Sequence, residues 1–333
     1  MKHPFFSIII PTYNKSKDIS RAIDSVLTQN YKNFELIISD NNSNDKTKEL
    51  IGSYKDKRIV YSRNKKNIGW IRNCEKGINL ARGEYVILLG DDDYICSKNS
   101  LFNLSKTIKG KNFGYIRLNY VSSKDGKKFD FRVNKFFKKD MILKPHQNNN
   151  KIFSFIQNTD PFFITGICFK KNFPNEIKFI DSEFVPWFNI IYYNAQKYGG
   201  YYHNKYFFIA KWVSKPIHPF YVLRNKKFPF EKYLETISKL ISQKKFQYYK
   251  RKILSQVISL FPLIKISMGN RGLIKCAKRV LYLSHNYKFS LHFWINFFSS
   301  IFLPNFIIER LKGYYLNLII KDNKIKNNLK WTN

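Results

Sequence analysis

The sequence predicts an α/β fold, in which a mainly parallel sheet is flanked by helices and followed by a helical, basic C-terminal extension. Two observations carry this prediction. Short apolar runs alternate with segments of helical periodicity from residue 5 to residue 90, which is typical of βαβ units. Three of these runs end in polar clusters, PTYN, DNNSND and GDDD, and ligands bind at the carboxyl ends of the strands in such sheets.

Each element follows from its local pattern. Buried apolar runs bounded by breakers predict strands at residues 5–10, 34–39, 58–64, 85–90, 115–121 and 162–169. Apolar residues at helical spacing predict helices at 17–29, 46–54, 71–81 and 187–199, the last closed by Gly199-Gly200. Residues 124–128 predict a hairpin turn, and the Lys- and Asn-rich stretch 134–151 predicts a loop. From about residue 228 the pattern is helical to the end.

We expect one domain over residues 1–220 and a helical, basic and aromatic region over 221–333. The chain has 333 residues, of which 44% are hydrophobic, so it can bury a sizeable core and is not a disordered protein. Its net charge of +36 is uneven, because from residue 201 onward 25 Lys and Arg stand against 4 acids. A field of that sign attracts nucleic acid or an anionic membrane, and composition does not choose between them.

Cysteine usage and the N-terminus both indicate a cytoplasmic protein. Cys74, Cys96, Cys168 and Cys276 lie far apart, without a CxxC pair, which predicts reduced thiols. The apolar run 5–10 is too short for a signal peptide and ends at once in a proline.

An acidic triplet, Asp91-Asp92-Asp93, directly follows the predicted strand 85–90. Adjacent carboxylates repel one another and shift each other's titration unless a cation is present. Oxygen ligands of this kind suit Mg²⁺ or Mn²⁺, which bind one or two carboxylates together with substrate phosphates. The alternative for an isolated triplet is a solvated acidic turn.

The triplet has a wider context. In order, spacing and strand context, FSIIIPTYNK, FELIISDNNSNDKT and NKKNIGWIRNCEKGINLARGEYVILLGDDD resemble family-2 glycosyltransferases of the GT-A fold, of the bacterial surface-polysaccharide type. The resemblance is strong over residues 5–100 and weak over 160–210. It implies transfer of a sugar, with inversion, from a nucleotide-diphosphate sugar (a UDP-sugar favoured) to a saccharide hydroxyl. The acceptor is expected to be lipid-linked, in O-antigen, capsule or lipooligosaccharide biosynthesis.

The resemblance also implies residues that bind the donor, in the loops after the first three strands. They are Pro11, Thr12, Tyr13, Asp40, Asn67, Gly69 and Arg72. Asp40 corresponds to the carboxylate that accepts hydrogen bonds from the base. Asn41 stands where the family commonly has a second acid, so base recognition would depend on Asp40. The alternative for Asp40 is a helix N-cap or Asx-turn, and for Arg72 a solvated helix residue.

The triplet resembles the family's DxD motif, read here as Asp91-x-Asp93. In this reading Asp93 ligates a Mn²⁺ or Mg²⁺ ion that bridges the diphosphate, and Asp91 and Asp92 contact metal waters or ribose. Many members carry their first acid where this chain has Gly90, so the register is open by one position. The cation would stabilise the charge on the departing nucleotide diphosphate.

Inverting members of the family use a carboxylate to deprotonate the acceptor hydroxyl. Asp181 and Glu183 are the candidates in this chain, with Asp181 favoured and Asp160 a third possibility. The alternative is that each is a capping or surface acid. His203 and His218 could reach the metal, but a lone His is more often structural.

Residues 289–308 contain no Asp, Glu, Lys or Arg and are long enough to span a bilayer core of roughly 30 Å. However, His292, Asn296, Ser299 and Ser300 form a polar stripe at helical spacing, and Pro304 interrupts the pattern. We therefore expect an amphipathic helix at an anionic membrane surface, with the protein peripheral on the inner face of the cytoplasmic membrane. The alternatives are a spanning helix and a helix packed on the catalytic domain.

Two other functions stay open. The charge and the aromatic residues would suit a nucleic-acid-binding protein, yet no nucleic-acid module is recognisable and the acidic triplet repels phosphate without a metal, so no nucleic acid is expected as partner. The other is an inactive, transferase-like scaffold at the membrane.

Overall fold

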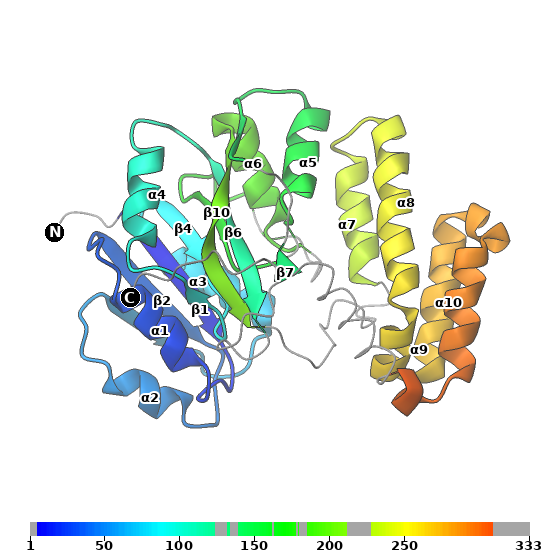
Figure 1. Ribbon diagram of the computed structural model, residues 1–333, viewed down its shortest axis with the longest axis horizontal. Helices are drawn as coiled ribbons and strands as arrows, with labels where there is room; N and C mark the ends of the chain where they lie inside the picture. The colour runs from blue at the N-terminus through cyan, green and yellow to red at the C-terminus, as the bar shows by residue number, and fades with distance from the viewer. Residues whose placement is uncertain are drawn as a thin grey trace. The chain divides into compact units, whose positions relative to one another are not determined.

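The computed structural model describes residues 5–123, 132–133, 139–161, 163–177, 179, 185–211 and 228–308. These residues fall into two compact units: those up to 179 and 187–211 form the first, and 185–186 and 228–308 form the second. The first unit is α/β and the second is helical (Figure 1). The predicted domain division at 220/221 falls among residues 212–227, outside the described part of the chain.

The first unit is built on one mixed sheet with the strand order β3-β2-β1-β4-β9-β6-β10-β5. The strands are β1 (Phe6–Thr12), β2 (Phe34–Asp40), β3 (Ile59–Arg63), β4 (Tyr85–Leu88), β5 (Tyr94–Ile95), β6 (Tyr115–Ser123), β7 (Arg132–Val133), β8 (Met141–Leu143), β9 (Ile167–Lys170) and β10 (Gly200–Lys211). Strands β3, β2, β1 and β4 are parallel, as predicted, and β9 runs antiparallel between β4 and β6. The parallel half therefore carries the first three polar clusters at one edge.

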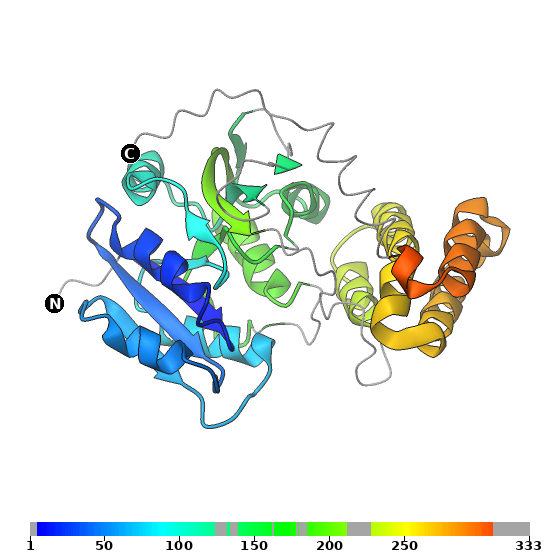
Figure 2. The ribbon, with the colours of Figure 1, turned by 60° about the horizontal axis from the view of Figure 1, so that its bottom comes forward.

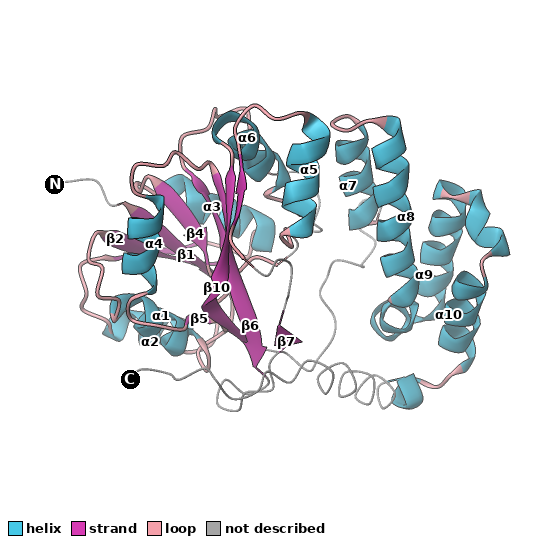
Figure 3. Ribbon diagram, turned by 45° about the horizontal axis from the view of Figure 1, so that its top comes forward, coloured by secondary structure: helices cyan, strands magenta, loops and turns pink. Residues whose placement is uncertain are grey.

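Helices cover both faces of the sheet (Figure 3). They are α1 (Ile19–Leu27), α2 (Thr47–Ser53), α3 (Trp70–Leu80), α4 (Ser100–Ile108), α5 (Asn149–Asn158) and α6 (Phe188–Tyr198). Side chains alternate along β1, so Ile8 and Ile10 join one core with α1 and α4. Ile9 faces α3, where a Cβ on Gly77 would come within 2.6 Å of the Ile9 Cγ2. The apolar centre of β1 is thus buried on both faces, as is typical of parallel strands.

The elements predicted up to residue 90 are confirmed, and the later ones differ in part. The predicted loop 134–151 contains β8 and the start of α5, and β10 and α4 were not predicted. The predicted strand 162–169 begins only at Ile167, because Gly166 adopts a left-handed φ of +90° and makes a turn. The predicted hairpin turn 124–128 lies outside the described residues.

The second unit is helical, as predicted from residue 228 (Figure 2, yellow to orange). It consists of α7 (Pro229–Ser238), α8 (Gln243–Ser259), α9 (Phe261–Leu283), the 3₁₀ turn η2 (His285–Phe289) and α10 (Leu291–Phe302). Helix α9 bends at Gly269, which has a φ of +66°. Within the described ranges, no helix has both the length and the apolar character needed to cross a membrane.

Candidate active site

The carboxyl ends of β1, β2 and β4 meet at one edge of the sheet. Thr12 pairs with Asp40 across β1 and β2, and Ile9 pairs with Leu88 across β1 and β4. The acidic triplet begins three residues after Leu88, so it lies beside the end of β1. The structure therefore brings the first two polar clusters and the triplet together, as the strand pattern predicts.

The ammonium group of Lys15, the residue that directly follows the first cluster, contacts the triplet. The Lys15 Nζ donates to the Asp92 Oδ2 at 2.7 Å and lies 3.5 Å from the Asp91 Oδ1. Burial lowers the pKa of the Lys15 amine, but Asp91 and Asp92 outweigh this effect, so the net shift is upward. Lys15 was not among the residues predicted from the sequence.

The loop that carries Lys15 is joined to the second cluster by hydrogen bonds. Asn14 N donates to Ser43 Oγ at 2.9 Å, and Lys15 N donates to Thr47 Oγ1 at 3.1 Å. Ser16 N donates to Asp45 at 3.0 Å. Although burial acts in the opposite direction, hydrogen bonds from Thr47 and Ser16 lower the pKa of Asp45 to about 2. Asp45 is therefore a charged acceptor that fixes this loop.

Asp93 differs from its two neighbours, because its side chain turns into the protein. It is 3% exposed, its Oδ1 accepts the Lys211 N–H at 2.8 Å, and its Oδ2 accepts the Thr165 hydroxyl. The Thr165 Oγ1 also accepts the Gly90 N–H at 2.9 Å. Both oxygens of Asp93 thus join the end of β4 to β10 and to the turn before β9.

The donor set of the triplet fits a divalent cation. Burial raises the pKa of Asp91 to about 6, with Lys15 opposing this shift and Asp92 adding to it. The Asp91 and Asp92 side chains remain 14% and 19% exposed. Among the described residues, no three His, Cys, Asp or Glu side chains are grouped to hold a metal ion. Mg²⁺ and Mn²⁺ need fewer than three protein ligands, since one or two carboxylates suffice when phosphates and water complete the coordination shell.

Asp40, the predicted base-binding residue, is fully buried at the end of β2. Its Oδ1 accepts the Ser43 N–H at 2.9 Å, which is a local turn bond, and its Oδ2 accepts the Tyr61 hydroxyl at 2.7 Å. Arg63 lies 3.5 Å from the same Oδ2. The turn role that was the alternative for Asp40 is thus present, and base binding stays a prediction.

The amide at position 41 has a structural use. The Asn41 Oδ1 accepts the Ile68 N–H at 2.9 Å, and the Asn41 Nδ2 donates to the Asn67 Oδ1 at 2.8 Å. Asn67 in turn accepts the N–H of Gly69, which has a φ of +84° and precedes α3. An amide can donate and accept, whereas a carboxylate only accepts, so Asn41 holds in place the loop with the predicted donor-binding residues Asn67 and Gly69.

The other predicted donor residues lie at the same edge of the sheet or in the adjoining loop and helix. Pro11 is half-buried in β1, and Tyr13 is 43% exposed just beyond it. Arg72 is exposed on the first turn of α3. The roles of these residues in donor binding stay predictions.

Of the three candidate bases, the described residues include only Asp160; Asp181 and Glu183 lie outside them. Asp160 has a left-handed φ of +54°, and its Oδ2 accepts the Tyr120 hydroxyl at 2.7 Å. Arg117 is 1% exposed and donates to the carbonyls of Thr159, at 2.9 Å, and Thr165, at 2.6 Å. Arg117 therefore holds the loop that carries both Asp160 and the partner of Asp93.

Of the two histidines considered as metal ligands, only His203 lies among the described residues, and it is not grouped with the triplet. His203 is buried in β10, its Nδ1 lies 3.2 Å from the Tyr201 hydroxyl, and burial lowers its pKa. His218 lies outside the described residues.

Comparison with known proteins decides the family. The sequence profile of Glycosyl transferase family 2 matches residues 7–178, which include β2, β3, β4, all of β1 except Phe6, and the triplet. The chain belongs to Glycosyl transferase family 2. The expected GT-A architecture is confirmed as well, since crystal structures of S. aureus TarS 1-349 share the fold, with a TM-score of 0.52 and 18% identity over 95% of this chain and 88% of that one.

Relatives of this glycosyltransferase differ in how much of their length it spans. It is 28% identical to a GalNAc(5)-diNAcBac-PP-undecaprenol beta-1,3-glucosyltransferase of Campylobacter jejuni, over 92% of this chain and 96% of the relative. It is 41% identical to WfaP of Escherichia coli, a UDP-Glc:alpha-D-GlcNAc-diphosphoundecaprenol beta-1,3-glucosyltransferase, over 26% of this chain. It spans 35% of WfaP and 35% of a Methanocaldococcus jannaschii glycosyltransferase to which it is 37% identical.

Sequence reasoning missed the residues that hold the triplet in place, namely Lys15, Thr165, Lys211 and Arg117. Only Lys15 left a usable signal, because it directly follows the PTYN cluster at a strand end. Thr165 lies 72 residues from Asp93 in the sequence, and no motif links the two. Lys211 acts through its backbone N–H, which no side-chain motif records.

Proposed function

We propose that this glycosyltransferase transfers a sugar, with inversion, from a nucleotide-diphosphate sugar to a hydroxyl of a lipid-linked saccharide. The donor is a UDP-sugar by preference, and the pathway is assembly of a cell-surface polysaccharide. The observation that carries the proposal is the acidic triplet beside the ends of β1 and β2 in a family-2 fold. Such a strand edge is where α/β sheets bind their ligands.

The relatives support the choice of donor and acceptor. The Campylobacter jejuni and Escherichia coli enzymes act on sugars joined through a diphosphate to undecaprenol, and the name of the latter includes UDP-Glc. One TarS 1-349 crystal structure contains UDP-GlcNAc. A lipid-linked acceptor keeps the reaction at the anionic inner face of the cytoplasmic membrane, where we propose that the protein works as a peripheral protein.

In the proposed reaction, the acceptor oxygen forms a bond to the anomeric carbon while the bond from that carbon to the diphosphate oxygen breaks. The acceptor proton passes to a carboxylate, for which Asp181, Glu183 and Asp160 are the candidates, and the electron pair leaves with the nucleotide diphosphate. Attack opposite to the leaving group inverts the anomeric configuration.

We assign Asp91 and Asp92 to a bound Mn²⁺ or Mg²⁺ ion, because their side chains are partly exposed and face Lys15. The sequence had assigned Asp93 and Asp91 to the metal. When bound, the ion would stabilise negative charge on the departing diphosphate. Lys15 lies where its ammonium can meet the same charge, and Asp93 keeps the end of β4 attached to Thr165 and Lys211.

A donor screen tests the proposal. Purified protein is mixed with Mn²⁺ and individual UDP-sugars, and release of UDP is followed with and without a lipid-diphosphate saccharide. We expect turnover with one donor, and a loss of at least 100-fold in Asp92→Asn, because electrostatic stabilisation of the leaving group is commonly worth about 10²–10³ in rate. Asp24→Asn, at an exposed carboxylate of α1, is the control and should retain activity. Absence of both donor binding and turnover with metal present would refute an active transferase and favour the scaffold.

A further inference from the structure

Helix α10 of the second unit exposes a row of large apolar side chains. Residues at spacings of four, three and four lie on one face of a helix, and the row continues past both ends of α10. The side chains are between 47% and 91% exposed: Phe289, Leu291, Ile295, Phe298, Phe302 and Phe306, together called the α10 stripe. Contiguous apolar surface of this kind is unusual on a soluble protein unless it binds something.

The stripe faces outward because the opposite side of α10 is fixed. Phe293 is fully buried, and its ring meets that of Phe261 on α9 edge to face, with centroids 5.5 Å apart. Ser300 is also buried, so the predicted polar stripe lies partly in the helix interface. The Lys265 Nζ donates to the carbonyls of Ile301, at 3.1 Å, and Leu303, at 2.6 Å, and so caps the helix end. Rotating α10 to bury the stripe would expose Phe293.

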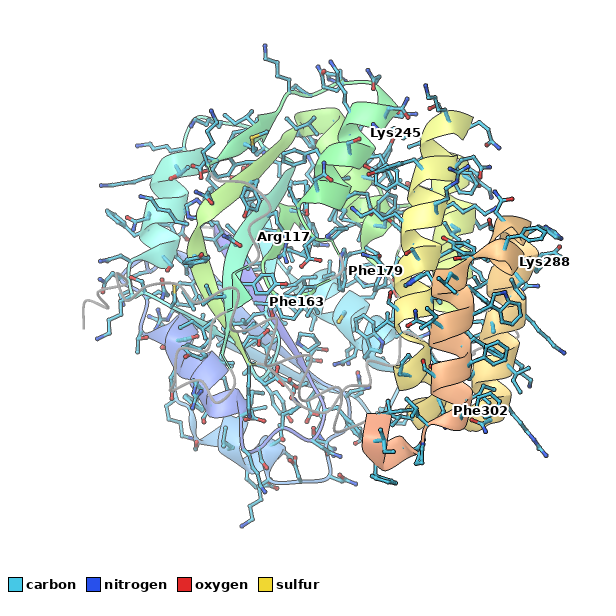
Figure 4. All side chains as sticks on the ribbon, turned by 45° about the vertical axis from the view of Figure 1, so that its right-hand side comes forward. Arg117, Phe163, Phe179, Lys245, Lys288 and Phe302 are labelled. Atoms are coloured by element: carbon cyan, nitrogen blue, oxygen red, sulfur yellow. The ribbon has the colours of Figure 1, made fainter. Side chains whose placement is uncertain are left out.

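The exposed rings support one another and are preorganised. Trp294 stacks on Phe298 with centroids 5.3 Å apart, and Phe298 stacks on Phe302 at 6.0 Å. The Trp294 Nε1 donates to the Lys288 carbonyl at 2.7 Å. Lys288 lies in η2, before the start of α10, and Phe302 is the last residue of α10 (Figure 4). The stripe therefore needs little ordering when it meets a partner.

The unit that carries the stripe is strongly basic. Residues 228–308 contain 13 Lys and Arg against 2 acids. One acid, Glu231, is paired with Arg279, while the side chains of Lys244, Arg251, Lys252, Arg271, Lys275, Lys278 and Lys288 are exposed. A second copy of this chain would bring like charges together, and an anionic surface would not. The expected partner therefore carries negative charge and has an apolar region that can cover the α10 stripe.

We propose that the α10 stripe inserts into the head-group region of an anionic lipid bilayer, with α10 lying parallel to the membrane plane. The proposal rests on the proposed function, because a lipid-linked acceptor lies at that surface. Leu291 and Ile295 provide no ring on which a nucleobase could stack, and the segment 289–308 has no Lys or Arg to meet a phosphate backbone, so lipid is favoured over single-stranded nucleic acid. An amphipathic apolar face beside exposed bases is the pattern of interfacial helices.

Vesicle flotation of the full chain tests the proposal, with phosphatidylcholine vesicles that contain either no phosphatidylglycerol or about one third. We expect binding to the anionic vesicles, and an affinity at least tenfold lower for the double variant Phe298→Ala/Phe302→Ala, since each substitution removes an exposed apolar ring from the stripe. Phe102→Ala, at an exposed Phe of α4 in the first unit, is the matched control and should bind like the unchanged protein. Circular dichroism checks that the double variant keeps its helices.

Four outcomes would overturn the proposal. They are no binding to anionic vesicles, equal binding by the double variant, binding that is lost only when residues 309–333 are removed, and displacement of the vesicles by single-stranded DNA at physiological salt. UDP release with a water-soluble acceptor separates this test from that of the proposed function. The double variant should keep that activity, and a protein inactive towards every donor could still bind vesicles.

Discussion

Replacing Lys15 with Met should strengthen the binding of a divalent cation to the acidic triplet. Lys15 Nζ lies 2.7 Å from the Asp92 Oδ2 and 3.5 Å from the Asp91 Oδ1, so a cation that takes these oxygens must displace the ammonium group. Methionine keeps most of the apolar stem and removes the charge. The substitution therefore removes a competitor for the same two carboxylates.

The magnitude follows from the exposure of the pair. The side chains of Lys15 and Asp92 are 32% and 19% exposed, so each ion pair is worth about 1 kcal/mol, as is typical near a protein surface. Two such contacts give about 1–2 kcal/mol, and about 1.4 kcal/mol corresponds to a tenfold change in affinity. We therefore expect Lys15→Met to bind Mn²⁺ about tenfold more tightly than the unchanged protein in the absence of nucleotide.

Titration of free Mn²⁺ by electron paramagnetic resonance measures this affinity directly. Lys17→Met is the matched control, because Lys17 is an exposed lysine two residues away, and it should leave the affinity unchanged. The effect on UDP should be the opposite, because the displaced ammonium group of Lys15 can contact the diphosphate. Lys15→Met should therefore bind UDP more weakly than the unchanged protein does when Mn²⁺ is present. Unchanged or weaker Mn²⁺ binding by Lys15→Met would refute the reasoning, whereas an unchanged protein that binds no Mn²⁺ would refute the metal site itself.

Three further predictions concern the surroundings of the triplet. Thr165→Val should lower the free energy of unfolding by about 1–3 kcal/mol, because the Asp93 Oδ2 and the Gly90 N–H both lose a buried partner; urea unfolding measures this, and Thr165→Ser should retain most of the stability. Arg117→Met should lower the free energy of unfolding by about 3–5 kcal/mol, because the buried carbonyls of Thr159 and Thr165 and the nearby Asp160 lose the guanidinium group. A decrease below about 1 kcal/mol in the same assay would contradict this role. Mn²⁺ affinity should fall as the pH is lowered from 7.5 through about 6, because the cation binds the ionised form of Asp91, whose pKa is raised to about 6; calorimetry at several pH values checks this, and a flat profile would contradict it.

The first half of the sheet could be predicted because its elements are local. Each apolar run from β1 to β4 is followed within a few residues by a helix or a polar cluster, so periodicity and breakers suffice. Strand β10 could not be found in this way. Its sequence GYYHNKYFFIAK does not alternate cleanly, and it is a strand because β6, β5 and β8 pair with it from more than fifty residues away. Helix α5 was hidden by the Lys and Asn residues before its buried Ile152 and Phe153.

The sequence was sufficient to predict where the candidate site lies on the sheet, but not which side chains contact one another within it. Strand ends placed Thr12, Asp40 and the triplet at one edge, and the structure has them there. The contacts that distinguish the three aspartates come from distant residues. Asp92 meets Lys15 across 77 positions, and Asp93 meets Thr165 across 72 and Lys211 across 118. No motif spacing carries such information.

Gly90 gives a physical reason for the register of the motif in this chain. A Cβ at position 90 would lie 2.7 Å from the Asp93 Oδ2 and 3.1 Å from the Thr165 Oγ1, so a side chain there competes with the buried Asp93 for the same space. The buried position of Asp93 therefore requires a residue without a side chain at position 90. With Asp93 engaged by Thr165 and Lys211, the carboxylates left facing Lys15 are Asp91 and Asp92. We therefore propose that a cation would bind Asp91 and Asp92, because these two carboxylates can exchange Lys15 for an ion without breaking the contacts of Asp93 at the end of β4.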